Sequence, residues 1–263
     1  MSDGGLKADN ICFSRGNFSL ENISLETRCG EFLGIAGPNG CGKTTLLNIL
    51  SGLLPAQRGA VSICGEEILA AAPERRAALC AFLPAEISAS ADFTARETAV
   101  MGRSPALAWW RDYSAEDYGA VSAALKSVGL DAAADKPVNF LSTGERRKVF
   151  IAQTLCQAAP VLILDEPTAH LDLKCQLEIF GLLRETAKKQ NRAVIAVSHD
   201  ISMLLRFCDT VLLLKHGRRA AYGPPEKAVD ASAMREVYGV DAEICRDGAG
   251  SLHLLAKNPV YYY

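Results

Sequence analysis

Eight residues near the N-terminus have types and a spacing that suit phosphate binding. The pattern G-x-x-x-x-G-K-[ST] is matched by Gly37, Pro38, Asn39, Gly40, Cys41, Gly42, Lys43 and Thr44. The glycines let backbone N–H groups converge on phosphate oxygens, and the positive end of a following helix favours negative charge. Lys43 can bridge the β- and γ-phosphates of a nucleotide, and the Thr44 hydroxyl can ligate Mg²⁺. An ordinary glycine turn is the alternative, but Lys-Thr after a strand-like segment favours a site for ATP and Mg²⁺.

Two acids follow an apolar run much further along the chain. Residues 161–164 read Val-Leu-Ile-Leu and lead into Asp165 and Glu166. A buried strand of this kind would deliver Asp165 to the Mg²⁺ shell, and Glu166 can accept a proton from an attacking water or orient it. Many strands simply end in solvated acids, so this pattern gains its force from the phosphate loop in the same chain.

Ser142 and Gly144 lie in the sequence Leu-Ser-Thr-Gly-Glu at residues 141–145. Serine followed three residues later by glutamate is a capping box, which starts a helix, and taken alone that interpretation is preferred. The two interpretations are compatible, because a helix N-terminus with an exposed glycine N–H also binds anions. Ser142 and Gly144 are therefore candidates to touch a γ-phosphate presented by another subunit.

His199 follows the apolar segment 193–197. A lone histidine after a strand is more often structural, and His170, His216 and His253 are assigned that role. The carboxyl end of a parallel strand is where such sheets bind ligands, so His199 is a candidate to sense the γ-phosphate.

The elements that position these residues alternate between strand and helix. Alternating or apolar runs predict strands over residues 18–25, 31–37, 59–64, 161–164, 193–197 and 210–215. Helical periodicity is found over residues 43–53, 95–101, 115–128, 142–158 and 175–189. This order predicts an α/β fold with a mostly parallel sheet covered on both faces, after a β-rich first part.

The composition excludes several classes of protein. With 263 residues and a net charge of −2, the chain has no basic excess that would recruit nucleic acid. Its apolar runs are far too short for a spanning helix, and residues 1–10 lack a targeting signal, which favours the cytoplasm. The nine cysteines are scattered without metal-ligand spacing. Cys64, Cys80, Cys156 and Cys208 are expected to be small buried residues.

The motifs in their order resemble the ATPase subunit of ATP-binding-cassette (ABC) transporters. Besides the phosphate loop they are LSTGE (141–145), LILDEP (162–167), HLD (170–172) and VSHD (197–200), and the resemblance covers about residues 6–255. Residues 93–97, 101–105 and 238–241 are similar to the branch that energises import of ferric siderophores, haem and cobalamin.

The resemblance implies one ABC domain with three parts. A nucleotide-binding core of the P-loop NTPase type, with an N-terminal antiparallel β-subdomain, would comprise residues 6–84 and 160–223. A helical subdomain carrying the signature helix would comprise residues 85–159, and a C-terminal extension residues 224–263.

The resemblance also implies a mechanism. Two copies would dimerise head to tail around two ATP molecules, so that Ser142 and Gly144 of one face the phosphate loop of the other. Glu166 would be the base, Lys43 and His199 would act on the γ-phosphate, Thr45 would join the nucleotide contacts, and Asp172 would lie at the interface. The implied partners are membrane-spanning permease subunits and, indirectly, a substrate-binding protein, with the chain peripheral at the cytoplasmic face of the inner (plasma) membrane.

The sequence departs from the family pattern at three places. Ala85 stands where a glutamine usually contacts Mg²⁺ and water, which predicts slower or poorly coupled hydrolysis. Arg15 stands where an aromatic residue usually stacks on adenine, although a guanidinium plane can also stack and Phe13 lies close. Thr143 and Glu145 replace glycine and glutamine of the signature.

Three functions compete. The preferred one is a transport ATPase for an iron chelate, haem, a corrinoid or another small substrate. A regulatory cassette that closes on ATP but hydrolyses it weakly is favoured by Ala85 and Thr143. A cassette acting on DNA or ribosomes usually has long coiled-coil insertions, tandem cassettes or basic surfaces, and the sequence shows none of these. The Trp109-Trp110 pair alone is weak support for base stacking.

Overall fold

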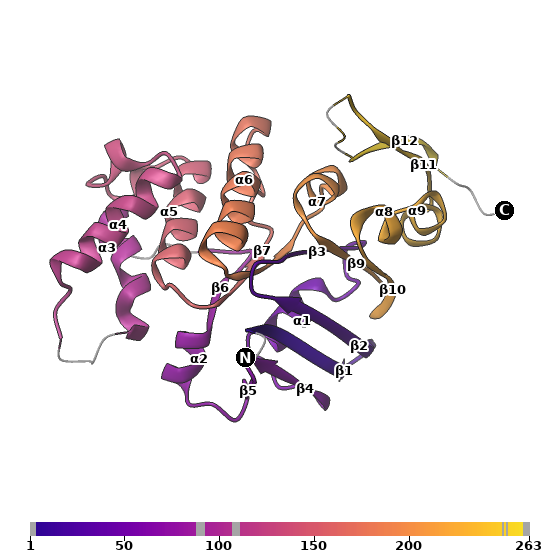
Figure 1. Cartoon of the computed structure of the whole chain (residues 1–263), viewed down its shortest axis with the longest axis horizontal. Coiled ribbons are helices and arrows are strands. Elements are labelled where there is room, and N and C mark those ends of the chain that lie inside the picture. The colour runs from indigo at the N-terminus through magenta and orange to yellow at the C-terminus, as the bar shows by residue number, and fades with distance from the viewer. Residues whose placement is uncertain (1–3, 88–92, 107–110, 249, 251, 260–263) are drawn as a thin grey trace.

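A six-stranded sheet forms the centre of the computed structural model, which describes residues 4–87, 93–106, 111–248, 250 and 252–259 (Figure 1). Side by side, its strands are β10 (Arg218–Gly223), β9 (Thr210–Lys215), β3 (Phe32–Ala36), β8 (Ala193–Val197), β7 (Val161–Asp165) and β6 (Cys80–Leu83). Neighbouring strands are parallel except for β10, which pairs antiparallel with β9. The carboxyl ends of five strands therefore meet at one edge.

Both faces of the parallel part of this sheet are buried, which explains the uninterrupted apolar sequences of strands such as β3, β7 and β8. In β3, Phe32 and Ala36 belong to one hydrophobic cluster, while Leu33 and Ile35 belong to a second cluster on the other side. All four side chains are at most 1% exposed. The sheet is thus a rigid layer that fixes the loops at its carboxyl edge.

The second cluster is closed by an antiparallel sheet and one helix. The sheet has the order β2 (Phe18–Arg28), β1 (Gly5–Arg15), β4 (Arg58–Ile63) and β5 (Glu66–Glu67), and the helix is α1 (Lys43–Leu50). Leu46, Leu47, Ile49 and Leu50 of α1 are fully buried in this cluster. The antiparallel sheet contributes the alternating apolar residues of its strands, such as Leu20 and Ile23.

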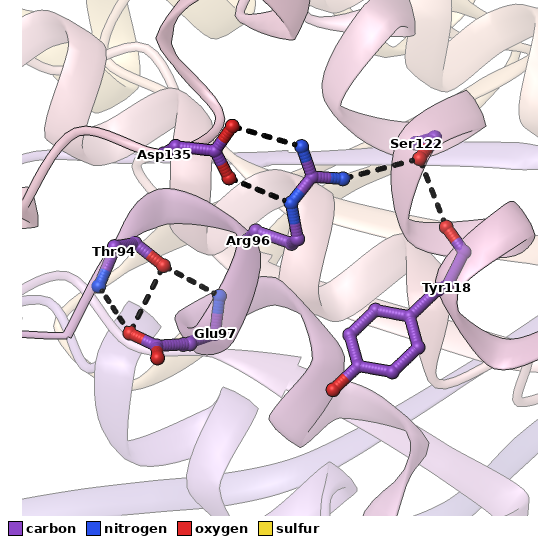
Figure 2. A network of polar contacts seen from close by, with 6 residues as sticks. All are labelled: Thr94, Arg96, Glu97, Tyr118, Ser122 and Asp135. Carbon is purple, nitrogen blue, oxygen red and sulfur yellow. Dashed lines mark hydrogen bonds and ion pairs between the residues drawn. The ribbon is translucent and has the colours of Figure 1, made fainter. Parts of the chain in front are cut away.

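A group of helices lies between β6 and β7 in the chain. Its elements are α3 (Ala95–Val100), the 3₁₀ turns η1 (Met101–Ala106), η2 (Asp131–Ala133) and η3 (Val138–Phe140), α4 (Ala115–Ser127) and α5 (Thr143–Cys156). Figure 2 shows how polar groups join them. Arg96 of α3 pairs with Asp135 at 2.8 Å and reaches Ser122 of α4 at 3.5 Å, while Thr94 and Glu97 form a capping box. Residues 93–97, which carried the subfamily resemblance, thus have structural roles here.

The remaining helices are α2 (Pro73–Leu79), α6 (Leu173–Gln190), α7 (Ile201–Phe207), α8 (Pro225–Ala228) and α9 (Ala231–Tyr238). The chain continues into a hairpin of β11 (Val240–Arg246) and β12 (Leu252–Pro259), which packs beside α7 (Figure 1).

The predicted fold class is confirmed, and each predicted helix and strand corresponds to an observed element within a few residues. Strand β6 was missed, because four residues ending at Leu83 are too short to show a period. Cys64 was expected to be buried but is only half-buried, since it follows the end of β4 at a turn. Trp109 and Trp110 lie outside the described residues. No helix of the described residues is long and apolar enough to cross a membrane.

Candidate functional site

The loop between β3 and α1 needs glycine at two positions for steric reasons. A Cβ atom on Gly37 would lie 2.3 Å from the carbonyl oxygen of Leu214. At Gly42, which has φ 107°, it would lie 2.6 Å from the ring of Phe18. The two glycines thus let the loop pass close to the core, where it leads from the carboxyl end of β3 directly into α1.

The start of α1 has the properties of an anion site. Among the described residues, no side chain caps this helix, and its first turn contains no acid. Its first N–H groups therefore remain available for an anion. The buried Lys43 ammonium donates to the carbonyl oxygens of Gly37 at 2.8 Å and Pro38 at 3.0 Å, which holds the cation over the loop. Pro38, Asn39, Gly40 and Cys41, the other residues predicted to contact phosphate, lie between β3 and α1 in the same loop.

Thr44 and Asp165 come together at the carboxyl edge of the sheet. The Thr44 hydroxyl donates to Oδ2 of Asp165 at 2.7 Å. The other carboxylate oxygen, Oδ1, is buried and has no hydrogen-bond partner among the described residues. Burial raises the pKa of Asp165, and the Thr44 hydrogen bond opposes this. A buried, unsatisfied carboxylate oxygen beside a hydroxyl fits a hard cation such as Mg²⁺.

The described residues contain no cluster of three or more His, Cys, Asp or Glu side chains suited to hold a metal by themselves.

Glu166 and His199 face each other across the ends of β7 and β8. Nε2 of His199 lies 2.6 Å from Oε1 of Glu166. Both side chains line a pocket of about 150 Å³, together with Gln176 and Ser198. Glu166 has φ 49°, a left-handed conformation that a non-glycine residue rarely adopts and that clusters at functional sites. The predicted acid and histidine thus share one solvent-accessible pocket.

A second pocket lies beside the phosphate loop. It has a volume of about 400 Å³ and is lined by Phe13, Arg15, Phe18, Thr45, Asn48, Leu53 and Leu54. The predicted contacts Arg15 and Thr45 are therefore brought together, with two aromatic rings beside them. Phe18 and Asn48 were not predicted. Phe18 faces Arg15 in the β1–β2 hairpin, a pairing that the Gly16 turn signals but that sequence reasoning did not use.

Ser142 and Gly144 are not joined to the phosphate loop by any hydrogen bond of the described residues. Ser142 is the N-cap of α5 and forms a full capping box with Glu145, so the structural interpretation of this motif is confirmed. Asp172 likewise caps α6 by accepting from the N–H of Cys175 at 2.8 Å. A Cβ on Gly144 would lie 3.0 Å from Leu171, so the LSTGE and HLD segments are neighbours.

Ala85 is exposed just beyond β6, and its backbone contacts a buried arginine that sequence reasoning missed. Arg147 of α5 donates to the carbonyl oxygen of Ala85 at 2.9 Å and to that of Glu166 at 2.9 Å. Arg147 lies in a run of charged residues, 145–148, and such a run is typical of the exposed face of a helix. The three-dimensional structure alone shows that it is buried.

Comparison with known proteins places these features in a family. Residues 20–169 match the sequence model described as "ABC transporter". The hemin import ATP-binding protein HmuV of Streptomyces coelicolor is 39% identical over 227 residues, which are 86% of this chain and 79% of that protein. The ferric enterobactin transport ATP-binding protein FepC of Escherichia coli is 32% identical, covering 92% of this chain and 90% of that protein.

Another relative is longer. The uncharacterized ABC transporter ATP-binding protein YvrA of Bacillus subtilis is 36% identical over 90% of this chain, which spans 54% of that protein.

Solved structures show the same fold. One is an inward-facing putative metal-chelate type ABC transporter, with a TM-score of 0.83, 23% identity and 98% coverage of both chains. A second is a dimeric ATP-binding cassette bound to ADP and Pi, with a TM-score of 0.74, 26% identity, and 84% and 99% coverage. The predicted resemblance to ABC ATPases is confirmed.

Proposed function

The chain belongs to the ABC transporter family, and we propose that it binds and hydrolyses ATP to energise an importer. One observation carries this proposal: the hydrogen bond between Thr44 and Asp165 holds the phosphate loop against the strand end that bears Glu166. This contact supports an assignment of phosphate binding and water activation to the same edge of the sheet.

In the proposed reaction each residue acts on a different part of the substrate. The N–H groups of the phosphate loop and the Lys43 ammonium bind the phosphates and stabilise their charge. Glu166 orients the attacking water and accepts its proton. His199, at 2.6 Å from Glu166, holds that carboxylate in place and donates to the γ-phosphate once nucleotide separates the pair.

Thr44 and Asp165 are the residues proposed to hold Mg²⁺. The ion would neutralise charge on the β- and γ-phosphates when bound. The unsatisfied Oδ1 atom of Asp165 supports this assignment. The adenine would occupy the pocket of Arg15 and Phe18, next to the loop.

We further propose that two copies form a head-to-tail dimer in which Ser142 and Gly144 bind the partner copy's γ-phosphate. A dimeric ATP-binding cassette is among the similar structures, which supports a site completed by another subunit. Glu145 accepts the Ser142 hydrogen bond at 2.8 Å, so nucleotide would compete for that hydroxyl.

The proposed cargo is an iron-siderophore, haem or cobalamin, because relatives are named for transport of ferric enterobactin, hemin and cobalamin. Permease subunits would anchor the chain at the cytoplasmic face of the membrane and would receive cargo from a substrate-binding protein. Residues 85–159 would form the subdomain that moves against them. The observation that favours an alternative, a cassette with weak hydrolysis, is Ala85, which lacks a polar side chain.

Co-purification with the permease, followed by measurement of ATP hydrolysis with candidate cargo-loaded binding proteins, tests the proposal. We expect a stimulated rate that Glu166→Gln abolishes. Stable ATP-bound dimers of the unsubstituted protein without turnover would favour the weakly hydrolysing alternative, and a Glu166-independent rate would refute the assigned chemistry.

A further inference from the structure

Arg147 is a buried cation near the start of α5 that is held by backbone oxygens. Arg147 is only 7% exposed. Among the described residues, no carboxylate forms an ion pair with its guanidinium. One nitrogen, Nη1, donates to the carbonyl oxygens of Pro84 at 2.8 Å and Ala85 at 2.9 Å. These carbonyls belong to the segment that directly follows β6, so Arg147 fixes the backbone at the position where the usual glutamine is missing.

The other donors of Arg147 reach the end of β7. Nη2 donates to the carbonyl oxygens of Asp165 and of Glu166, the latter at 2.9 Å, and Nε lies 3.4 Å from the carbonyl oxygen of Pro167. A single planar guanidinium thus contacts three consecutive carbonyls around Glu166. This uses the fork of fixed donors that distinguishes arginine from lysine.

The peptide held in this way is strained. Glu166 has φ 49°, and such a conformation persists only where the surrounding structure stabilises it. The carbonyl groups on both sides of the Glu166 Cα atom accept from the same Nη2 atom. The direction in which the Glu166 carboxylate leaves the backbone therefore depends on Arg147.

We infer that Arg147 is a positioning residue for ATP hydrolysis. It orients the Glu166 carboxylate towards the reaction centre and couples this orientation to the position of the Pro84–Ala85 backbone. The inference rests on the proposed function, in which Glu166 activates water. Movement of α5 relative to the sheet would pull on both strand ends at once. A backbone link through Arg147 thereby joins the helical region to the catalytic carboxylate without any contribution from the Ala85 side chain.

A purely structural role is the competing explanation, because buried carbonyl groups need donors wherever they occur. Arg192 provides a matched control. It is 6% exposed and donates to the carbonyl oxygens of Ala159 at 2.6 Å and Leu155 at 3.3 Å. Burial lowers the pKa of both arginines to about 10, so both remain cations at neutral pH. Arg192 directly precedes β8, at the edge of the sheet opposite Glu166.

The experiment compares Arg147→Met, Arg147→Lys and Arg192→Met in the full-length chain. ATP hydrolysis is titrated with nucleotide to separate kcat from KM, and thermal unfolding is measured on the same samples. Because a small misplacement of a catalytic group is costly, we expect Arg147→Met to lower kcat about 10- to 100-fold. The KM for ATP should stay within about twofold, since phosphate binding does not involve Arg147.

Arg192→Met should lower the unfolding temperature to a similar extent while kcat is retained. Arg147→Lys, which keeps the charge but lacks the fork, should recover only part of kcat, and it serves as the test if Arg147→Met does not fold. Equal kcat values for the unsubstituted protein, Arg147→Lys and Arg147→Met would overturn the inference. Absence of Glu166-dependent hydrolysis in the unsubstituted protein would instead refute the proposed function itself.

Discussion

Thr44 and Asp165, which are 121 positions apart in the sequence, share a hydrogen bond of 2.7 Å. Thr44 belongs to the first turn of α1, and Asp165 ends strand β7, which lies two strands from β3 in the sheet. The contact brings a phosphate loop and an acidic strand end into one site.

Replacing Thr44 by valine, which has nearly the same shape, should remove the Mg²⁺-dependent part of nucleotide binding. A ligand present at a hundredfold excess over its Kd stabilises a protein by about 2.7 kcal/mol, so the effect is readable as a thermal shift. We expect Thr44→Val to show the same ATP-induced shift with and without Mg²⁺. Thr44→Ser, which keeps the hydroxyl, is the control, and a full Mg²⁺ effect in Thr44→Val would contradict the assignment.

His199→Gln should lower kcat for ATP hydrolysis by roughly a hundredfold, within the range that proton-transfer and orienting groups contribute. The KM should change little, because the phosphate loop is intact. His253→Gln is a matched control, since His253 also pairs with a carboxylate, Asp247, at 2.8 Å but lies in the C-terminal hairpin. Equal losses in the two variants would show that His199 has no special role.

Ala85→Gln should raise the permease-stimulated rate of hydrolysis. One added hydrogen bond to the reacting water or Mg²⁺ would contribute about 1 kcal/mol, or roughly fivefold in rate. Ala123 is also an exposed alanine but lies on α4, so Ala123→Gln controls for the change in side-chain size. A stimulated rate in Ala85→Gln that equals that of the unsubstituted protein would show that Ala85 does not limit the reaction.

Arg15→Tyr should tighten ATP binding about two- to twelvefold, because aromatic stacking is worth about 0.5–1.5 kcal/mol beyond buried area. It should also increase the preference for ATP over GTP, if stacking in the Arg15 pocket orients the base. Arg58→Tyr, on neighbouring β4 but not among the residues of that pocket, is the control. Unchanged affinities measured by nucleotide titration would place adenine elsewhere.

Asp117 should stabilise the protein only above strongly acidic pH. A hydrogen bond from the Ser114 N–H, followed by bonds from Arg103 and the Ser114 hydroxyl, lowers the pKa of Asp117 to about 2. Its pKa in the unfolded chain is about 4, so the stabilisation is complete above that pH and is lost as the pH falls through about 2.

Asp117→Asn should therefore lower the midpoint of urea unfolding at neutral pH, and its deficit should shrink as the pH falls from 4 towards 2. Asp131→Asn, at an exposed position, controls for the general loss of a negative charge. A deficit that does not depend on pH would mean that Asp117 acts through packing rather than through its charge.

Local pattern explains why the sequence predicted the phosphate loop, the acid pair and most elements of the central sheet. Residues 37 and 42 are glycine because a Cβ atom there would clash with neighbouring atoms. The run before Asp165 is apolar because it is buried on both faces of a parallel sheet. The Ser142 motif shows the limit of this reasoning, because a capping box and an anion site have the same residues. Strand β6 was missed for a different reason, because four residues are too few to show a strand period.

The sequence alone determined the residue types of a nucleotide site and the order of those strands and helices that have a clear local pattern, because these depend on spacing within a few turns. Only the tertiary structure determined that Thr44 reaches Asp165, that Glu166 faces His199 and that Arg15 shares a pocket with Phe18. It alone also showed that Arg147 is buried against the carbonyls of two strand ends. Such contacts depend on which strands become neighbours in the sheet, and this order is determined by the packing of the whole core.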